Sequence, residues 1–130
     1  MSGRPTDVLA AVSAFAGCSR KEIHRVARYT LEERHPQGTV LIDEGTKGDE
    51  FYVIVEGRVE VLQGGEVVDT LGPGQFFGEV ALLGHVTRNA TIRAATPVRL
   101  LLLPARSFRS LIGRYPAIFD QVVNALEQRA

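Results

Sequence analysis

The chain has 130 residues with 45% hydrophobic and 23% charged residues, and its fifteen basic and fifteen acidic side chains give no net formal charge. Two domains of this total length would each be too small to bury a stable core without disulfides or metal, so we expect one domain. The composition excludes intrinsic disorder, and the absence of net charge argues against direct binding to nucleic acid.

The first part of the chain is expected to be helical. Thr6 or Asp7 can cap a short helix that runs to Phe15, because apolar side chains recur on one of its faces. After Gly17, the Ser19 hydroxyl and the Glu22 carboxylate have the spacing of a capping box, which predicts a second helix that ends near Arg28.

From residue 29 onward the pattern favours β-strands. Short runs of β-branched and aromatic residues alternate with glycine and proline, as in an antiparallel sandwich or barrel. The predicted strands are 29–34, 40–42, 51–55, 59–62, 67–71, 90–93 and 98–103. Gly64 and Gly65 predict a hairpin, and Gly72-Pro73-Gly74 predicts a turn. The leucines at 100–103 predict a strand that is buried on both faces.

The last part of the chain is again expected to be helical. Pro104 suits the first turn of a helix that contains Phe108 and Leu111, and Pro116 begins a last helix. We therefore expect a mainly β fold: an antiparallel β-roll, or jelly-roll barrel, of roughly eight strands with helices at both ends. The expected single domain, residues 1–130, comprises helical residues 6–28, a β-roll at 29–103 and helices at 105–129.

Residues 76–93 carry the most distinctive chemistry. Gly78 precedes a short helix-competent run that begins at Glu79, and a glycine before a helical turn lets an anion approach free backbone N–H groups. Arg88 can hold a phosphate with its guanidinium, whereas the Glu79 carboxylate accepts hydrogen bonds from hydroxyls. These groups suit a nucleotide cyclised through its phosphate with a free ribose hydroxyl.

The sequence Phe-Gly-Glu-Val-Ala-Leu-Leu at 77–83, followed by Arg-Asn-Ala-Thr at 88–91, resembles the phosphate-binding cassette of the cyclic-nucleotide-binding domain family. That family includes the regulatory subunits of cyclic-AMP-dependent kinase, catabolite-activator-type regulators and cyclic-nucleotide-gated channels. The turns at Glu44-Gly45, Gly48-Asp49, Glu56-Gly57 and 71–74 also match, so the resemblance extends from about residue 9 to residue 126. The cassette itself spans 76–91.

The resemblance implies a role for each cassette residue. Glu79 would accept from the ribose 2′-hydroxyl, Arg88 would hold the cyclic phosphate, and Gly78 would let the sugar lie close. The backbone N–H groups of Ala81 and Asn89 would also reach the phosphate. The residues expected to contact the ligand are Gly78, Glu79, Val80, Ala81, Arg88, Asn89 and Ala90.

Other positions complete the implied site. Leu82 and Leu83 would relay movement of the cassette, and Val61 and Ile92 are candidates for the base pocket. Where this sequence has Asn89, the family often has Ala, Ser or Thr, and a hydroxyl there favours guanine. We expect cyclic AMP as the ligand, with cyclic GMP as the alternative.

The implied function is a non-enzymatic sensor that couples ligand binding to its C-terminal helices. Its output domain or partner would not be encoded in this chain, and the last helices of two copies could pair in a homodimer. Two alternatives stay open: an interaction domain of the same fold that does not bind nucleotide, and a small metalloenzyme on a jelly roll.

The remaining reactive residue types give no further site. His24, His35 and His85 lack the spacing of metal ligands, so no metal is expected, and Cys18 is expected to be a packing residue. One cysteine cannot form an intramolecular disulfide, which favours a reducing cytoplasm. No apolar stretch reaches the ~18 residues of a membrane span, and residues 1–7 lack the pattern of a secretory signal.

Overall fold

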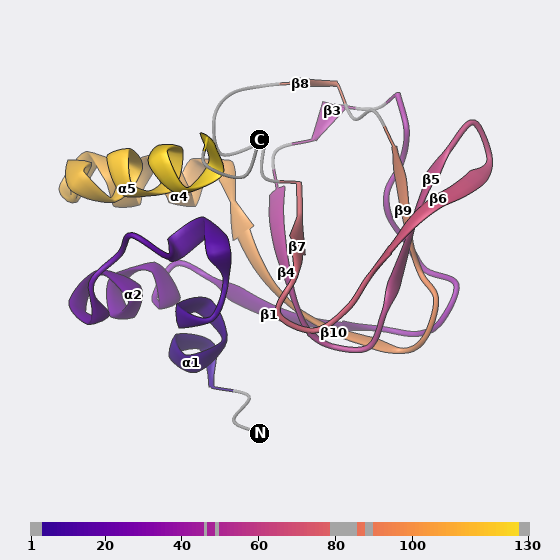
Figure 1. The fold of residues 1–130 in the computed structure, drawn as a ribbon, viewed down its shortest axis with the longest axis horizontal. Helices are drawn as coiled ribbons and strands as arrows, with labels where there is room; N and C mark the ends of the chain where they lie inside the picture. Colours follow the sequence, from indigo (N-terminus) through magenta and orange to yellow (C-terminus); the bar gives the residue numbers. More distant parts are fainter. Residues whose placement is uncertain (1–3, 46, 49, 79–85, 88–89, 128–130) are drawn as a thin grey trace.

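A computed structural model describes residues 4–45, 47–48, 50–78, 86–87 and 90–127. Figure 1 shows the helices from both ends of the chain gathered on one side of a β-roll, with the β5–β6 hairpin extending from the opposite side. The helical elements are α1 (Pro5–Ala10), the 3-10 turn η1 (Ser13–Phe15), α2 (Arg20–Ala27), α4 (Ala105–Arg114) and α5 (Pro116–Glu127). The strands are β1 (Leu31–His35), β2 (Val40–Ile42), β3 (Lys47–Gly48), β4 (Glu50–Glu56), β5 (Val59–Gln63), β6 (Glu66–Leu71), β7 (Phe76–Phe77), β8 (Val86–Thr87), β9 (Thr91–Ala94) and β10 (Val98–Pro104).

The strands form two four-stranded antiparallel sheets with the orders β1-β10-β4-β7 and β2-β9-β5-β6, and β3 pairs with β8. Buried side chains from both four-stranded sheets make one apolar cluster inside the roll. The expected fold class, an antiparallel β-roll of about eight strands with terminal helices, is therefore confirmed.

Strands β4 and β10 are buried on both faces. Because side chains alternate along a strand, Phe51 and Leu101 face the helices, whereas Tyr52 and Leu100 face the interior of the roll. The predicted doubly buried strand at 100–103 is thus confirmed, since each of these leucines is at most 3% exposed. The helices cover the outer face with the side chains Leu9, Val12, Phe15, Ile23, Val26, Phe108, Leu111, Ile118 and Val122.

The predicted capping box starts α2. The Ser19 backbone N–H donates to Glu22 Oε1 at 2.8 Å, and Ser19 Oγ accepts from the Glu22 backbone N–H at 3.1 Å. The predicted first helix, in contrast, is interrupted, because Val12 is extended with ψ at 129° and divides α1 from η1. The turn lets Val12 and Phe15 both enter the helical side of the core, where each is 1% exposed.

Two turns, at Pro104 and at Gly57, show how the backbone enters α4 and passes from β4 to β5. Pro104 is the last residue of β10 and the N-cap of α4, with ψ at 146°, so it lies just before the helical turn predicted for it. Gly57, between β4 and β5, has φ at 89°, and a Cβ there would overlap the carbonyl oxygen of Pro97. Only glycine fits this turn without a shift of the backbone.

Candidate functional site

Gly78 lies near the start of the cassette and is the first of the expected ligand-contact residues. It follows β7, and its φ of 79° lies in the left-handed region that side chains with a Cβ rarely adopt. Strand β7 is held by β4, where Tyr52 pairs with Phe77 and Val53 pairs with Phe76. The rings of Tyr52 and Phe77 stack with their centroids 4.7 Å apart, so the residue before Gly78 is fixed by packing.

The other end of the cassette enters β9. Ala90 is buried, with 9% of its surface exposed, and β9 begins at Thr91 and pairs with both β2 and β5. Strand β8 pairs with β3, with Thr87 opposite Lys47, so the chain just before Arg88 lies beside the segment that follows β2. Both ends of the cassette are therefore held by strands of the roll.

Five of the seven predicted ligand-contact residues lie outside the described residues. These are Glu79, Val80, Ala81, Arg88 and Asn89, and Leu82 and Leu83 lie outside them as well. The described part of the chain includes Gly78 and Ala90, the first and the last of the seven expected ligand-contact residues. The expected helical run after Gly78 is likewise outside the described residues.

Glu44 ties together three segments near the cassette. Its backbone N–H donates to Thr91 Oγ1 at 3.1 Å, and its Oε1 accepts from the Gly64 backbone N–H at 3.2 Å. The turn after β2, the start of β9 and the β5–β6 turn are thereby linked. The sequence predicts the Glu44-Gly45 turn but gives no local signal of this contact, because Glu44 and Thr91 are 47 residues apart.

The candidate base-pocket residues lie on neighbouring strands. Val61 of β5 is opposite Ile92 of β9, and Ile92 is also opposite Ile42 of β2. Ile92 belongs to the apolar cluster inside the roll, and Val61 packs against that cluster. The structure therefore brings this predicted pair together on the sheet from which β9 continues the cassette.

An aromatic series connects β7, at the start of the cassette, to the helices. Phe76 of β7 packs on Phe51 of β4 with ring centroids 5.3 Å apart, and Phe51 meets Phe15 of η1 edge to face at 5.8 Å. Phe76 and Phe77 point to opposite faces of the sheet, so one contacts the helical layer and the other the roll interior.

The described cysteine and histidines outside the cassette do not form a catalytic or metal site. Burial, with a smaller contribution from the Glu22 carboxylate, raises the pKa of the Cys18 thiol to about 11. The thiol is therefore protonated at neutral pH and poorly suited to nucleophilic attack. His24 lies on α2, and His35 ends β1 with Nε2 3.0 Å from Glu33 Oε1. Within the described ranges no group of three His, Cys, Asp or Glu side chains could hold a metal ion.

Arg99 pairs with carboxylates of two neighbouring strands on the β1-β10-β4 sheet. Its guanidinium reaches Glu32 Oε1 at 2.9 Å and Glu56 Oε1 at 3.1 Å. The hydrogen bond from Arg99 holds the pKa of the Glu32 carboxyl below its ordinary value. This cluster joins three strands and lies apart from the two ends of the cassette, so we assign it to the stability of the sheet.

Every helix in the described ranges is too short or too polar to cross a membrane.

The comparisons with known proteins point to one family. The family model described as "Cyclic nucleotide-binding domain" matches residues 32–115. A cyclic nucleotide-gated potassium channel from Rhizobium etli is 38% identical over 127 residues, which are 97% of this chain and 36% of the channel. This chain thus spans about a third of that relative's length.

Solved structures agree with the sequence match. The N-terminal domain of a transcriptional regulator from Streptomyces coelicolor A3(2) superposes with a TM-score of 0.86 and 26% identity, over 95% of this chain and 90% of that one. The regulatory domain of Toxoplasma gondii PKA, crystallised with cAMP, gives a TM-score of 0.75 and 29% identity, over 83% of this chain and 43% of that one. The β-roll, its terminal helices and the match across residues 32–115 together show that the chain belongs to the cyclic nucleotide-binding regulatory domain family.

Proposed function

We propose that this chain senses cyclic AMP, with Arg88 holding the cyclic phosphate and Glu79 accepting from the ribose 2′-hydroxyl. The observation that carries the proposal is the way the cassette is held. Gly78 has a left-handed φ at the end of β7, and buried Ala90 leads into β9. Both ends are therefore anchored in the roll, and the chain between them contains the arginine and the carboxylate that a cyclic nucleotide requires.

The remaining cassette positions have supporting roles in this proposal. The backbone N–H groups of Ala81 and Asn89 donate to the phosphate, and Gly78 leaves room for the sugar. Val80 and Ala90 complete the contacts at either end. The ligand's single negative charge is matched by one guanidinium, while the Glu79 carboxylate faces hydroxyls and is kept away from the phosphate.

Cyclic AMP is proposed over cyclic GMP because Asn89 supplies no hydroxyl at the position where the family's hydroxyl favours guanine. The cAMP complex of the 29% identical Toxoplasma regulatory domain supports the same choice. Val61 and Ile92, which face each other across β5 and β9, are the residues that we assign to the base.

We propose that the ligand acts on the helices through the cassette. Phe76, two residues before Gly78, contacts Phe51, and Phe51 contacts Phe15 of η1, which in turn packs with α5. Movement at Leu82 and Leu83 would add a second connection to helices 105–129. A ligand can shift such an equilibrium only by its difference in affinity for the two arrangements.

The whole protein is proposed to be a non-catalytic cytoplasmic regulator in which residues 1–130 form one domain. Its output would lie in a further domain or a separate partner, as the channel and kinase relatives suggest. Pairing of α5 with α5 of a second copy is part of the proposal, because Phe119 on that helix is 36% exposed.

Calorimetric titration with cyclic AMP, cyclic GMP and linear AMP tests the ligand. The proposal expects saturable binding of one molecule per chain, with cyclic AMP tightest and linear AMP weakest. Heat and thermal stability that do not change with any cyclic nucleotide would instead identify an interaction domain that retains the fold without the ligand. Hydrogen exchange with and without cyclic AMP tests the coupling, which predicts altered protection in helices 105–129.

A further inference from the structure

Charge is divided in space between the helices and the roll. Described residues 4–30 and 105–127 carry eight Lys or Arg and four Asp or Glu, whereas the described residues of 31–104 carry five and nine. Figure 1 shows these two parts on opposite sides of the molecule. The net neutrality of the chain therefore conceals a positive helical side and a negative roll.

Helix α2 concentrates this positive charge on one face. At 3.6 residues per turn, its basic residues fall within a single sector, opposite the buried side chains of Ile23 and Val26. Glu22, the one acidic residue of α2, is bound to its own N-cap, Ser19. We define the basic face of α2 as Arg20, Lys21, His24 and Arg25 of the helix together with Arg28 at its C-cap.

The basic face has no carboxylate partner within the described part of the chain. None of the ion pairs that fall within 4.0 Å there includes one of its side chains. Arg25 instead lies over the Tyr115 ring, with Cζ 4.0 Å from the ring centroid. Like charges one turn apart, such as Lys21 and Arg25, destabilise a helix slightly. Binding of an external polyanion would relieve this repulsion and stabilise the helix.

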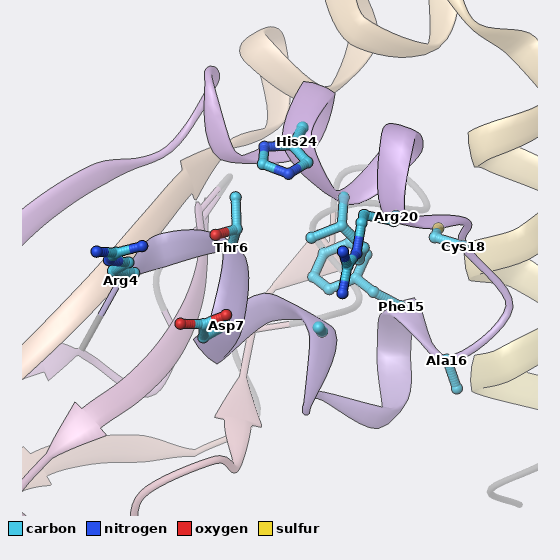
Figure 2. A pocket seen from close by; sticks show the side chains of 10 residues that line it. Arg4, Thr6, Asp7, Phe15, Ala16, Cys18, Arg20 and His24 are labelled. Atoms are coloured by element: carbon cyan, nitrogen blue, oxygen red, sulfur yellow. The ribbon is translucent and has the colours of Figure 1, made fainter. Parts of the chain in front are cut away.

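A pocket of about 420 Å³ adjoins the basic face, between α1, η1 and α2. Figure 2 shows Arg20 and His24 of α2 on one side and Thr6 and Asp7 of α1 on the other. Phe15 and Ile23 add apolar lining, and Arg4 adds a further guanidinium. The lining of this cavity is mainly polar and basic with a smaller apolar part, and its size is sufficient for one side chain of a bound segment.

We propose that the basic face of α2 and the adjoining pocket dock an acidic segment of a partner protein. Carboxylates of the segment pair with exposed Arg20 and Lys21, and one of its apolar side chains enters the pocket beside exposed Ala10. Attachment to a lipid surface would call for large apolar side chains beside the charges, and the basic face has none. A single-stranded nucleic acid would call for aromatic stacking platforms, and the basic face also lacks these.

The experiment uses a short fluorescein-labelled peptide of glutamates around a central leucine, followed by fluorescence anisotropy. Matched peptides replace the glutamates with glutamine or the leucine with serine. The test variant is Arg20→Glu with Lys21→Glu, which keeps α2 stable because acidic residues suit a helix N-terminus. The charge-matched control is Arg106→Glu with Arg109→Glu on α4, where both side chains are exposed. Ala10→Leu narrows the pocket without changing charge.

We expect the α2 variant to weaken binding of the leucine peptide by about tenfold or more, and the α4 control to change it by less than about twofold. Ala10→Leu is expected to remove the advantage of leucine over serine. Equal losses in the α2 and α4 variants, or tighter binding to phosphatidylserine vesicles or single-stranded DNA than to the peptide, would overturn the proposal. Titration with cyclic AMP in every variant separates this result from the nucleotide site, because neither substituted pair belongs to the cassette.

Discussion

Tyr52 of β4 and Phe77 of β7 stack with their ring planes inclined by 15°, and this contact lies directly before the left-handed Gly78. Both rings are buried inside the roll, at 5% and 4% exposure. Strand β7 has only two residues, and Ile54 of β4 makes two further backbone hydrogen bonds with the turn just before it. The start of the cassette is therefore held both by side-chain packing within the roll and by backbone hydrogen bonds to β4.

Phe77→Ala is expected to lower the free energy of unfolding by about 3–5 kcal/mol, because it removes a buried ring and leaves a cavity. Denaturant unfolding measures this loss. Phe119→Ala is the matched control, since Phe119 is 36% exposed and its ring lies 6.5 Å from Phe108. A similar loss in the two variants would mean that the stacked pair does not fix β7.

Gly78→Ala is expected to destabilise the fold by about 1–2 kcal/mol, because the left-handed φ of 79° is strained for alanine. It should also weaken cyclic AMP binding, since the strain lies at the first of the proposed ligand-contact residues. Gly113→Ala is the control: it lies within α4, a Cβ there meets nothing within 4 Å, and alanine favours a helix by up to about 1 kcal/mol. If both variants changed stability in the same direction, backbone strain at Gly78 would be excluded.

Asn89→Thr is expected to raise the affinity for cyclic GMP relative to cyclic AMP. One added hydrogen bond contributes about 0.5–1.5 kcal/mol, which corresponds to a roughly 2- to 13-fold change in the ratio of the two dissociation constants. Competition titrations with both nucleotides measure this ratio. Asn89→Ala keeps the backbone N–H and adds no hydroxyl, so it should leave the preference for cyclic AMP in place; a shift toward cyclic GMP in this control would contradict the account.

Stability in acid is expected to depend on Arg99. The hydrogen bond from Arg99 holds the pKa of Glu32 below its ordinary value of 4.5 in the folded protein. A depressed carboxyl pKa stabilises the fold above the unfolded pKa, and the contribution is lost as the pH falls through the folded pKa. Arg99→Gln should therefore remove part of the stability at neutral pH and flatten its decline below pH 4.5. Urea unfolding at a series of pH values measures this change in the free energy of unfolding. The control, exposed Arg58→Gln, should keep the pH dependence of the wild type.

Much of the fold was predictable because strong local signals agreed with the final packing. The leucines at 100–103, the Gly64-Gly65 hairpin and the Ser19–Glu22 capping box each act within a few residues. The strands that sequence reasoning missed, β3, β7 and β8, have two residues each, which is too short for an alternating pattern. Val12 interrupts the first helix because tertiary packing of Phe15 against Phe51 overrides a continuous helical pattern.

The sequence predicted the two ends of the candidate site but not the long-range contacts beside it. The resemblance identified Gly78 and Ala90, and the left-handed φ of Gly78 agrees with the need for glycine there. The contacts of Glu44 with Thr91 and Gly64 could not be derived, because they join residues 47 and 20 positions apart. The roles of Glu79, Val80, Ala81, Arg88 and Asn89 stay predictions, since these residues lie outside the described ranges.

Calorimetric titration of cyclic AMP into the wild type, Arg88→Ala and Arg58→Ala tests the central claim most directly. Loss of the guanidinium that pairs with the phosphate should cost about 2–5 kcal/mol, or roughly 30-fold to several thousand-fold in affinity. Arg58 is exposed and outside the cassette, so its variant should bind like the wild type. Binding that is unchanged in Arg88→Ala, or weakened equally in both variants, would contradict the assignment of Arg88 to the cyclic phosphate.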